Sequence, residues 1–207
     1  MIFVCVAGGP SLTREDVEYC RGKAAVIVVN DGYRMAPWAD YLYAADHRWW
    51  ISTPNGEAEP NWRLSARTFR GERLTTDKGT ADMFGLGYIP HQPGRGLAKP
   101  PFIHGTNGGI EAVSIAALKG ARRILLLGYD MGATGSGHWF GDHPDAVTLP
   151  DGRVERLTSM DAHEFALARG EFAALAIDLE AAGIEVINCT RTTALECFFR
   201  KPIQECL

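Results

Sequence analysis

Short apolar segments recur along this chain, and each of them ends in small or polar residues. The segments are Ile2–Ala7, Ala24–Val29, Tyr41–Ala45, Arg122–Leu127 and Ile184–Asn188. Apolar runs of this length are typical of strands buried on both faces, as in a parallel sheet. Helical segments lie between them, notably Ile110–Lys119 and Met160–Ala182. The pattern predicts an α/β fold, a Rossmann-like and mainly parallel sheet with helices on both faces.

No internal repeat or linker divides the 207 residues, a length that suits one domain. Residues 1–207 are therefore interpreted as a single Rossmann-like nucleotide-binding domain, with loop insertions around 53–101 and 133–157. Within the first insertion, Leu64–Phe69 has the pattern of an edge strand. Thr190–Leu207 is expected to be a short helical tail.

Two helix starts have recognisable capping residues. Thr13, with Asp16 three positions later, predicts a capping box at the start of the first helix. Thr158 or Ser159 is expected to cap the long helix that follows the second insertion.

Charge and cysteine content narrow the function classes. The net charge of −4 and the pI of about 5.9 give no general electrostatic case for binding nucleic acid or an anionic membrane. The apolar runs are too short to span a bilayer, and no signal-peptide pattern precedes Ile2. Five cysteines without CxxC spacing fit reduced thiols. We therefore expect a cytoplasmic protein that binds small molecules.

The turn after the first strand has the residue types of a phosphate-binding loop. Gly8 and Gly9 let a ligand approach the main chain, and Ser11 precedes a helix whose N–H groups suit an anion. An ordinary strand-to-helix turn also favours these residue types. The chain has neither a Walker A loop nor a Gly-x-Gly-x-x-Gly fingerprint here, which disfavours a P-loop kinase and a dinucleotide dehydrogenase.

A second glycine-rich segment opens the alanine-rich helix. Gly108 supplies main-chain N–H groups at that helix start, and Thr106 and Asn107 add polar side chains for a ribose or phosphate. The alternative is a capped helix start with glycine-assisted packing. We expect the two glycine-rich segments to converge on one anion pocket.

Acidic and amide side chains follow other predicted strands. Asn30 and Asp31 follow the second strand, Asp46 follows the third, and Asp130 follows Arg122–Leu127. Ligands of open parallel sheets bind beyond the carboxyl ends of the strands. These side chains are therefore candidates for binding a ribose, a metal or an amine, or else they cap the next segment.

Three histidines are candidates for a general base. His138 and His143 flank Trp139 and Phe140 in the second insertion, which we interpret as a loop that covers substrate. His163 lies in the first turn of the long helix, whose positive end favours the neutral imidazole that a base requires. A structural metal is disfavoured because no third ligand stands at a recognisable spacing.

Several of these segments, in this order, resemble known families. Gly8-Gly9-Pro10-Ser11-Leu12, Asn30-Asp31, Gly108-Gly109 and Ile124–Asp130 resemble domain-of-unknown-function family 115, which includes an archaeal hydroxymethyl-dihydropterin pyrophosphokinase and motility-accessory proteins. They are also similar to bacterial lipooligosaccharide sialyltransferases and to small phage-encoded proteins.

These resemblances imply a nucleotide-dependent transferase, in the first place a glycosyltransferase-like enzyme with a nucleotide-activated donor, with an ATP-dependent pyrophosphokinase as the alternative. The sialyltransferase likeness implies a CMP-sugar donor, with phosphate at Gly8, Gly9 and Ser11. His163 is the nearest match to the base of that family, with His138 and His143 as the alternatives. The donor would also meet Asn30, Thr106, Asn107 and Gly108. The pyrophosphokinase likeness implies ATP, with Mg²⁺ held by Asp46 and Asp130.

One departure from the sialyltransferase pattern favours a third alternative. This chain has Ala7-Gly8-Gly9 where those enzymes have Gly-Asn-Gly, and it therefore lacks an asparagine that contacts the donor. A non-catalytic module that binds a nucleotide or a sugar stays open beside the two enzymes.

Overall fold

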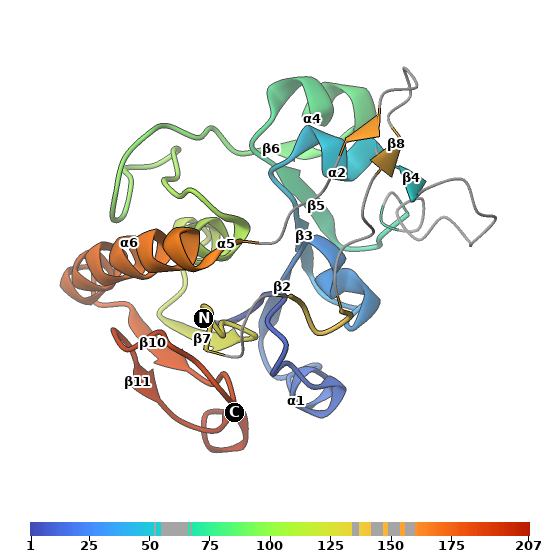
Figure 1. The fold of residues 1–207 in the computed structure, drawn as a ribbon. Coiled ribbons are helices and arrows are strands. Elements are labelled where there is room, and N and C mark those ends of the chain that lie inside the picture. Colours follow the sequence, from blue (N-terminus) through green and yellow to red (C-terminus); the bar gives the residue numbers. More distant parts are fainter. Residues whose placement is uncertain are drawn as a thin grey trace.

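The apolar runs form one sheet in the computed structural model, which describes residues 1–51, 53–54, 66, 68–133, 137–141, 147–148, 154–155 and 160–207. All eight strands are parallel, in the order β11-β10-β7-β1-β2-β3-β5-β6. They are β1 (Ile2–Val6), β2 (Ala25–Val29), β3 (Tyr41–Tyr43), β5 (Glu72–Thr75), β6 (Gly87–Tyr88), β7 (Arg123–Leu127), β10 (Glu185–Asn188) and β11 (Phe199–Arg200). Figure 1 shows this order, from β11 at the lower left to β6 at the top. The predicted single α/β domain with a parallel, Rossmann-like sheet is confirmed.

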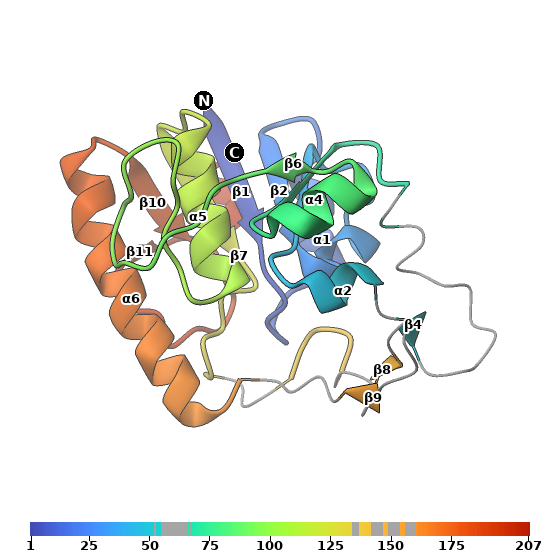
Figure 2. The same cartoon turned by 90° about the horizontal axis from the view of Figure 1, so that it is seen from above.

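The other elements are helices, single 3₁₀ turns and a small second sheet. The helices and turns are α1 (Arg14–Tyr19), η1 (Asn30–Arg34), α2 (His47–Ile51), α4 (Lys78–Phe84), α5 (Gly108–Leu118), α6 (Ala162–Ala181) and η2 (Ile203–Glu205). The antiparallel sheet consists of β4 (Thr53–Pro54), β8 (Val147–Thr148) and β9 (Val154–Glu155). It lies away from β10 and β11 in both views (Figure 2).

Alternate residues of the central strands enter two separate cores. Phe3 and Cys5 of β1 are fully buried in a cluster that includes side chains of α5 and α6. Val4 and Val6, which point the other way, are buried with side chains of α1 and η1. Figure 2 shows α5 and α6 together over one face. Because both faces are covered, the strands read as continuous apolar runs, which explains why the sequence revealed them.

The order of the strands reverses beside β1. From β1 the chain adds β2, β3, β5 and β6 on one side, then returns through α5 to place β7 on the other side of β1. Such a reversal separates the loops that follow the two neighbouring strands and leaves a crevice at their carboxyl ends. The β1–β7 boundary is therefore the topological switch point of the sheet.

The helix starts agree only in part with the expected caps. Thr13 caps α1, because its hydroxyl oxygen accepts a hydrogen bond from the N–H of Asp16 at 3.2 Å. The long helix starts later than expected, with Asp161 as its cap and Glu164 completing a capping box. The prediction of Thr158 or Ser159 is wrong because this reciprocal pair already satisfies donors of the first turn.

Two further expectations differ from the structure. The tail over Thr190–Leu207 is not helical apart from η2, because Phe199–Arg200 pairs with β10 and adds β11 to the sheet. In the segment Leu64–Phe69, Ala66 is helical and Phe69 lies outside any strand, whereas residues 64, 65 and 67 lie outside the described part. The strand forms a few residues later, as β5, and together with α4 and β6 it extends the sheet inside the expected 53–101 insertion.

Candidate functional site

A cavity of about 270 Å³ lies at the switch point, where the ends of β1, β2 and β7 meet the start of α5. We call it the switch-point cavity. Its lining includes these predicted site residues: Gly8, Gly9, Asn30, Asn107, Gly108, Asp130 and His138. The two glycine-rich segments therefore do converge on one cavity, at the position where open parallel sheets bind ligands.

The turn after β1 packs against the end of β7 at very short range. A Cβ atom on Gly9 would lie 2.6 Å from the carbonyl oxygen of Gly128 and nearer still to the carboxylate of Asp130. The N–H of Gly9 donates to that same carbonyl oxygen at 2.8 Å. Gly9 is therefore required by the packing of the two turns, whatever the cavity binds.

Asp130 holds this turn through Ser11. Its two carboxylate oxygens accept hydrogen bonds from the N–H of Ser11 at 2.8 Å and from the Ser11 hydroxyl at 2.9 Å. Only 2% of Asp130 is exposed. The main-chain N–H of Ser11, which was expected to bind phosphate, therefore donates to Asp130 instead. Ser11 does not line the cavity.

Asn107 caps α5 from the wall of the cavity. Its side-chain oxygen accepts hydrogen bonds from the N–H groups of Gly109 at 3.0 Å and Ile110 at 3.2 Å. This bonding fixes which end of the amide is oxygen, and the amide nitrogen has no partner among the residues that the structure describes. The cap uses two of the helix-start donors and leaves Gly108 as the first N–H of α5.

Two residues of the cavity wall have left-handed backbone angles that side chains disfavour. Asn30 has φ of 49° and Met131 has φ of 51°. They are the non-glycine residues with positive φ in the described part of the chain, and both line the cavity. Asparagine tolerates this conformation, whereas for methionine it is uncommon and costs about 1–3 kcal/mol. Such outliers collect at binding sites, which supports a functional reading of this cavity.

His138 is the histidine that the structure brings to the cavity. Its ring stacks on Phe140 with centroids 4.9 Å apart, and its Nδ1 would lie 2.7 Å from a Cβ atom on Gly8. The next residue, Trp139, donates its main-chain N–H to the carbonyl oxygen of Gly8 at 3.0 Å. The imidazole is therefore anchored beside the turn after β1 by main-chain and ring contacts.

The remaining predicted residues do not line this cavity. Thr106 and His163 are exposed, the latter in the first turn of α6. Asp31 is buried in η1 and accepts a hydrogen bond from the indole N–H of Trp49 at 3.2 Å. His143 lies outside the described residues.

Asp46 is engaged elsewhere. Its carboxylate accepts hydrogen bonds from the main-chain N–H of Arg48 at 2.8 Å and from the guanidinium of that residue. Asp46 therefore caps the start of α2, which is the alternative that the sequence left open. It does not line the switch-point cavity, whereas Asp130 does. Among the described residues no three potential ligands form a group that would hold a metal ion.

The sequence patterns missed the apolar wall of the cavity. Val29, Met131, Met160 and Phe165 line it beside the glycines. Phe165 of α6 is half-buried, packs against the core and lies over Gly132. The spacing of apolar residues in a helix predicts which of them lie on the same face, but it does not predict which cavity that face borders.

Two further findings concern the chain as a whole. No helix in the described residues combines the length and apolarity needed to cross a bilayer. No family model, curated protein or solved structure matches the chain.

Proposed function

We propose that the chain is a nucleotide-dependent transferase that binds a nucleotide-activated donor in the switch-point cavity. The observation that carries the proposal is the convergence of the turn after β1 and the start of α5 on one cavity at the strand reversal. Nucleotides of Rossmann-like sheets bind at this position, with phosphate near a helix N-terminus.

The lining divides into a part for phosphate and a part for a flat apolar group. Gly108 offers the first N–H of α5, at the positive end of an 11-residue helix. Val29 and Phe165, which lie beside Gly108 and Gly132, supply apolar surface for a base. A volume of about 270 Å³ suits part of a nucleotide better than a whole nucleotide-sugar, since sites for drug-sized ligands begin at about 300 Å³. The transferred group would then lie outside, near His138.

His138 would serve as the general base. Its imidazole accepts the proton of an acceptor hydroxyl while the acceptor oxygen bonds to the donor carbon. The bond from that carbon to the phosphate oxygen breaks, and the electron pair leaves with the nucleotide. The positive end of α5 stabilises the negative charge that develops on the departing phosphate. His138 takes this role over His163 because His138 lines the cavity.

A thermal-shift screen of the chain against CMP, UDP, GDP and ATP tests donor binding. One of these nucleotides should raise the melting temperature, since a ligand that binds only the folded state stabilises it. Failure of all four to shift the melting temperature would contradict the proposal.

The substitution Asn107→Asp tests whether the phosphate binds at the start of α5. The carboxylate keeps the cap on α5, because Asp and Asn cap helices about equally well, but it adds a negative charge beside the phosphate. Affinity for the nucleotide should fall by about ten-fold or more, whereas the melting temperature without ligand should hold. Thr106→Ala is the matched control, since Thr106 is adjacent, exposed and outside the cavity lining.

Two histidine variants separate an enzyme from a binding module. His138→Ala should retain nucleotide binding and lose turnover of the donor by about 100-fold or more, the usual contribution of a general base. His163→Ala should leave both unchanged. Nucleotide binding with no histidine-dependent turnover would instead identify the non-catalytic module.

A further inference from the structure

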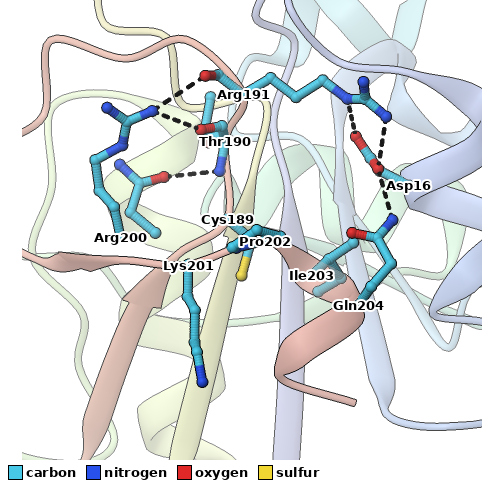
Figure 3. Close-up of a pocket in the computed structure, with 10 residues that line it drawn as sticks. Asp16, Cys189, Thr190, Arg191, Arg200, Lys201, Pro202, Ile203 and Gln204 are labelled. Carbon is cyan, nitrogen blue, oxygen red and sulfur yellow. Dashed lines mark hydrogen bonds and ion pairs between the residues drawn. The ribbon is translucent and has the colours of Figure 1, made fainter.

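A second pocket, of about 450 Å³, lies between the segment that follows β10, the C-terminal tail and α1 (Figure 3). We call it the tail pocket. Its lining residues come from 188–191, from 200–204 and from Asp16 of α1. None of them lines the switch-point cavity.

Positive charge is concentrated in the tail pocket. Arg191, Arg200 and Lys201 line it, and Asp16 is the carboxylate among its lining residues. The formal charge of the lining is thus +2, in a chain whose net charge is −4. Two exposed carboxylates lie just outside the lining, Glu15 at 3.7 Å from Arg191 and Glu205 at 3.4 Å from Lys201. The charge that favours an anion is therefore concentrated at Arg200.

The carboxylate of Asp16 is already engaged by the protein. Only 4% of Asp16 is exposed. It accepts hydrogen bonds from Arg191 at 2.6 and 3.0 Å and from the Gln204 amide at 3.2 Å (Figure 3). Burial works against its ionisation, but these bonds and one from Thr13 prevail and lower the pKa of Asp16. Asp16 stays ionised at neutral pH and fixes the position of Arg191.

Arg200 is held in place by acceptors of the main chain. Its Nη2 donates to the carbonyl oxygens of Thr190 at 3.4 Å and Arg191 at 3.1 Å. No carboxylate pairs with Arg200 in the described part of the chain, so its charge is uncompensated, and Nε and Nη1 keep donors for a ligand. Guanidinium groups fixed in this way bind the oxygens of a phosphate group with little loss of side-chain entropy.

Lys201 supplies a weaker, adjustable charge. Figure 3 shows its side chain extending away from Arg191 and Arg200. Its Nζ lies 3.4 Å from a Glu205 carboxylate oxygen, in an exposed i,i+4 pair. Such surface pairs contribute little, and the ammonium is therefore free to reorient towards an anion.

We infer that the tail pocket binds a small phosphorylated molecule through Arg200, with Lys201 adding charge. A phosphate monoester carries a charge of about −1.5 to −2 at neutral pH and has three acceptor oxygens, which suits the uncompensated Arg200 guanidinium better than a single carboxylate does. The inference does not depend on nucleotide binding in the switch-point cavity.

Titration of the full chain with inorganic phosphate and with glycerol 3-phosphate, at constant ionic strength, tests the inference by ¹H–¹⁵N NMR. The Nε–Hε signal of Arg200 and the amide signals of Thr190 and Arg191 should shift in a saturable way. Tighter binding of glycerol 3-phosphate identifies a phosphate ester as the natural ligand, and tighter binding of inorganic phosphate identifies the free ion. Acetate at the same concentration should bind more weakly than either.

Charge-removing variants locate the ligand. Arg200→Gln should weaken phosphate binding by about ten-fold or more, because a charge-assisted hydrogen bond is lost. Lys201→Gln, which disturbs only an exposed pair, should weaken it by about three-fold. Arg122→Gln is the control, since Arg122 is exposed at the amino end of β7. The inference is overturned if neither anion shifts these signals, if acetate binds as tightly, or if Lys201→Gln and Arg200→Gln both bind like the control.

Discussion

The switch-point cavity and the tail pocket both lie beyond the carboxyl ends of strands of one sheet, but different kinds of residue line them. Glycines, main-chain groups and apolar side chains line the first, and its one carboxylate is turned towards Ser11. Three cationic side chains line the second. The same sheet edge therefore offers two ways to hold an anion: oriented N–H groups in a narrow space, and charged side chains near the surface.

The two sites also differ in how tightly their walls are packed. The switch-point cavity contains the two left-handed non-glycine residues and the close contact at Gly9. The walls of the tail pocket are held by side-chain bonds to Asp16 and by the bonds from Arg200. Substitutions should therefore act on the first site through sterics and on the second through charge.

The largest effect is expected at Gly9. Gly9→Ala brings a methyl group against the backbone of Gly128 and the carboxylate of Asp130, and neither atom can move away cheaply. The free energy of unfolding should fall by about 3 kcal/mol in urea titrations. Gly170→Ala is the matched control: Gly170 lies in α6 with open space around it, so the variant should gain about 1 kcal/mol. Equal stability of the two variants would refute the packing argument.

An intermediate and pH-dependent effect is expected at Asp16. Asp16→Asn should lower the free energy of unfolding by about 1–2 kcal/mol at neutral pH, a modest figure because Arg191 is half exposed. The folded-state pKa of Asp16 is depressed below its ordinary value of 3.8. The stabilisation is therefore present above pH 3.8 and is lost as the pH falls through the lower folded-state pKa.

Urea titrations of the wild type and of Asp16→Asn, at neutral and at strongly acidic pH, measure how the stabilisation by Asp16 depends on pH. The difference between wild type and Asp16→Asn should shrink in acid. Asp82→Asn, which breaks an exposed pair with Lys78, should change stability by less than about 0.5 kcal/mol at either pH. A difference for Asp16→Asn that does not vary with pH would contradict the ionic role.

The smallest effect is expected at Asn30. Asn30 is exposed, and so its replacement tests backbone strain without loss of packing. Asn30→Ala should cost about 1 kcal/mol, because positive φ is less favourable for alanine than for asparagine. Asn30→Gly should match the wild type to within about 0.5 kcal/mol in the same urea titrations. If the alanine variant proves as stable as the glycine variant, the strain at the cavity wall is absent.

The strands and the long helices followed from local patterns. Ile2–Ala7 and Arg122–Leu127 stand out because both faces of their strands are buried, which makes nearly every residue apolar. The glycine-rich turns likewise follow from what a tight turn and a helix start require. β11 was missed because two residues of strand leave no periodic signal.

The sequence predicted the types of residue in the candidate site better than it predicted which individual residues line the cavity. Asp46 and Asp130 look alike in the sequence, each an aspartate after an apolar run, but one caps α2 and the other clamps Ser11. The sequence favours His163 as the base over His138, but packing of the 137–141 segment against Gly8 brings His138 to the cavity, whereas His163 is exposed outside its lining. Whether they act as proposed stays a prediction.

Side-chain polarity along the chain was enough to establish a parallel α/β sheet and the turns at its edge, because burial and turn geometry act over a few neighbouring residues. Which turns meet depended on strand order, which places β7 beside β1 although more than a hundred residues lie between them. That pairing, and the path of the tail that places Arg200 and Asp16 in the lining of one pocket, depend on long-range packing, whose free energy no short stretch of residues contains.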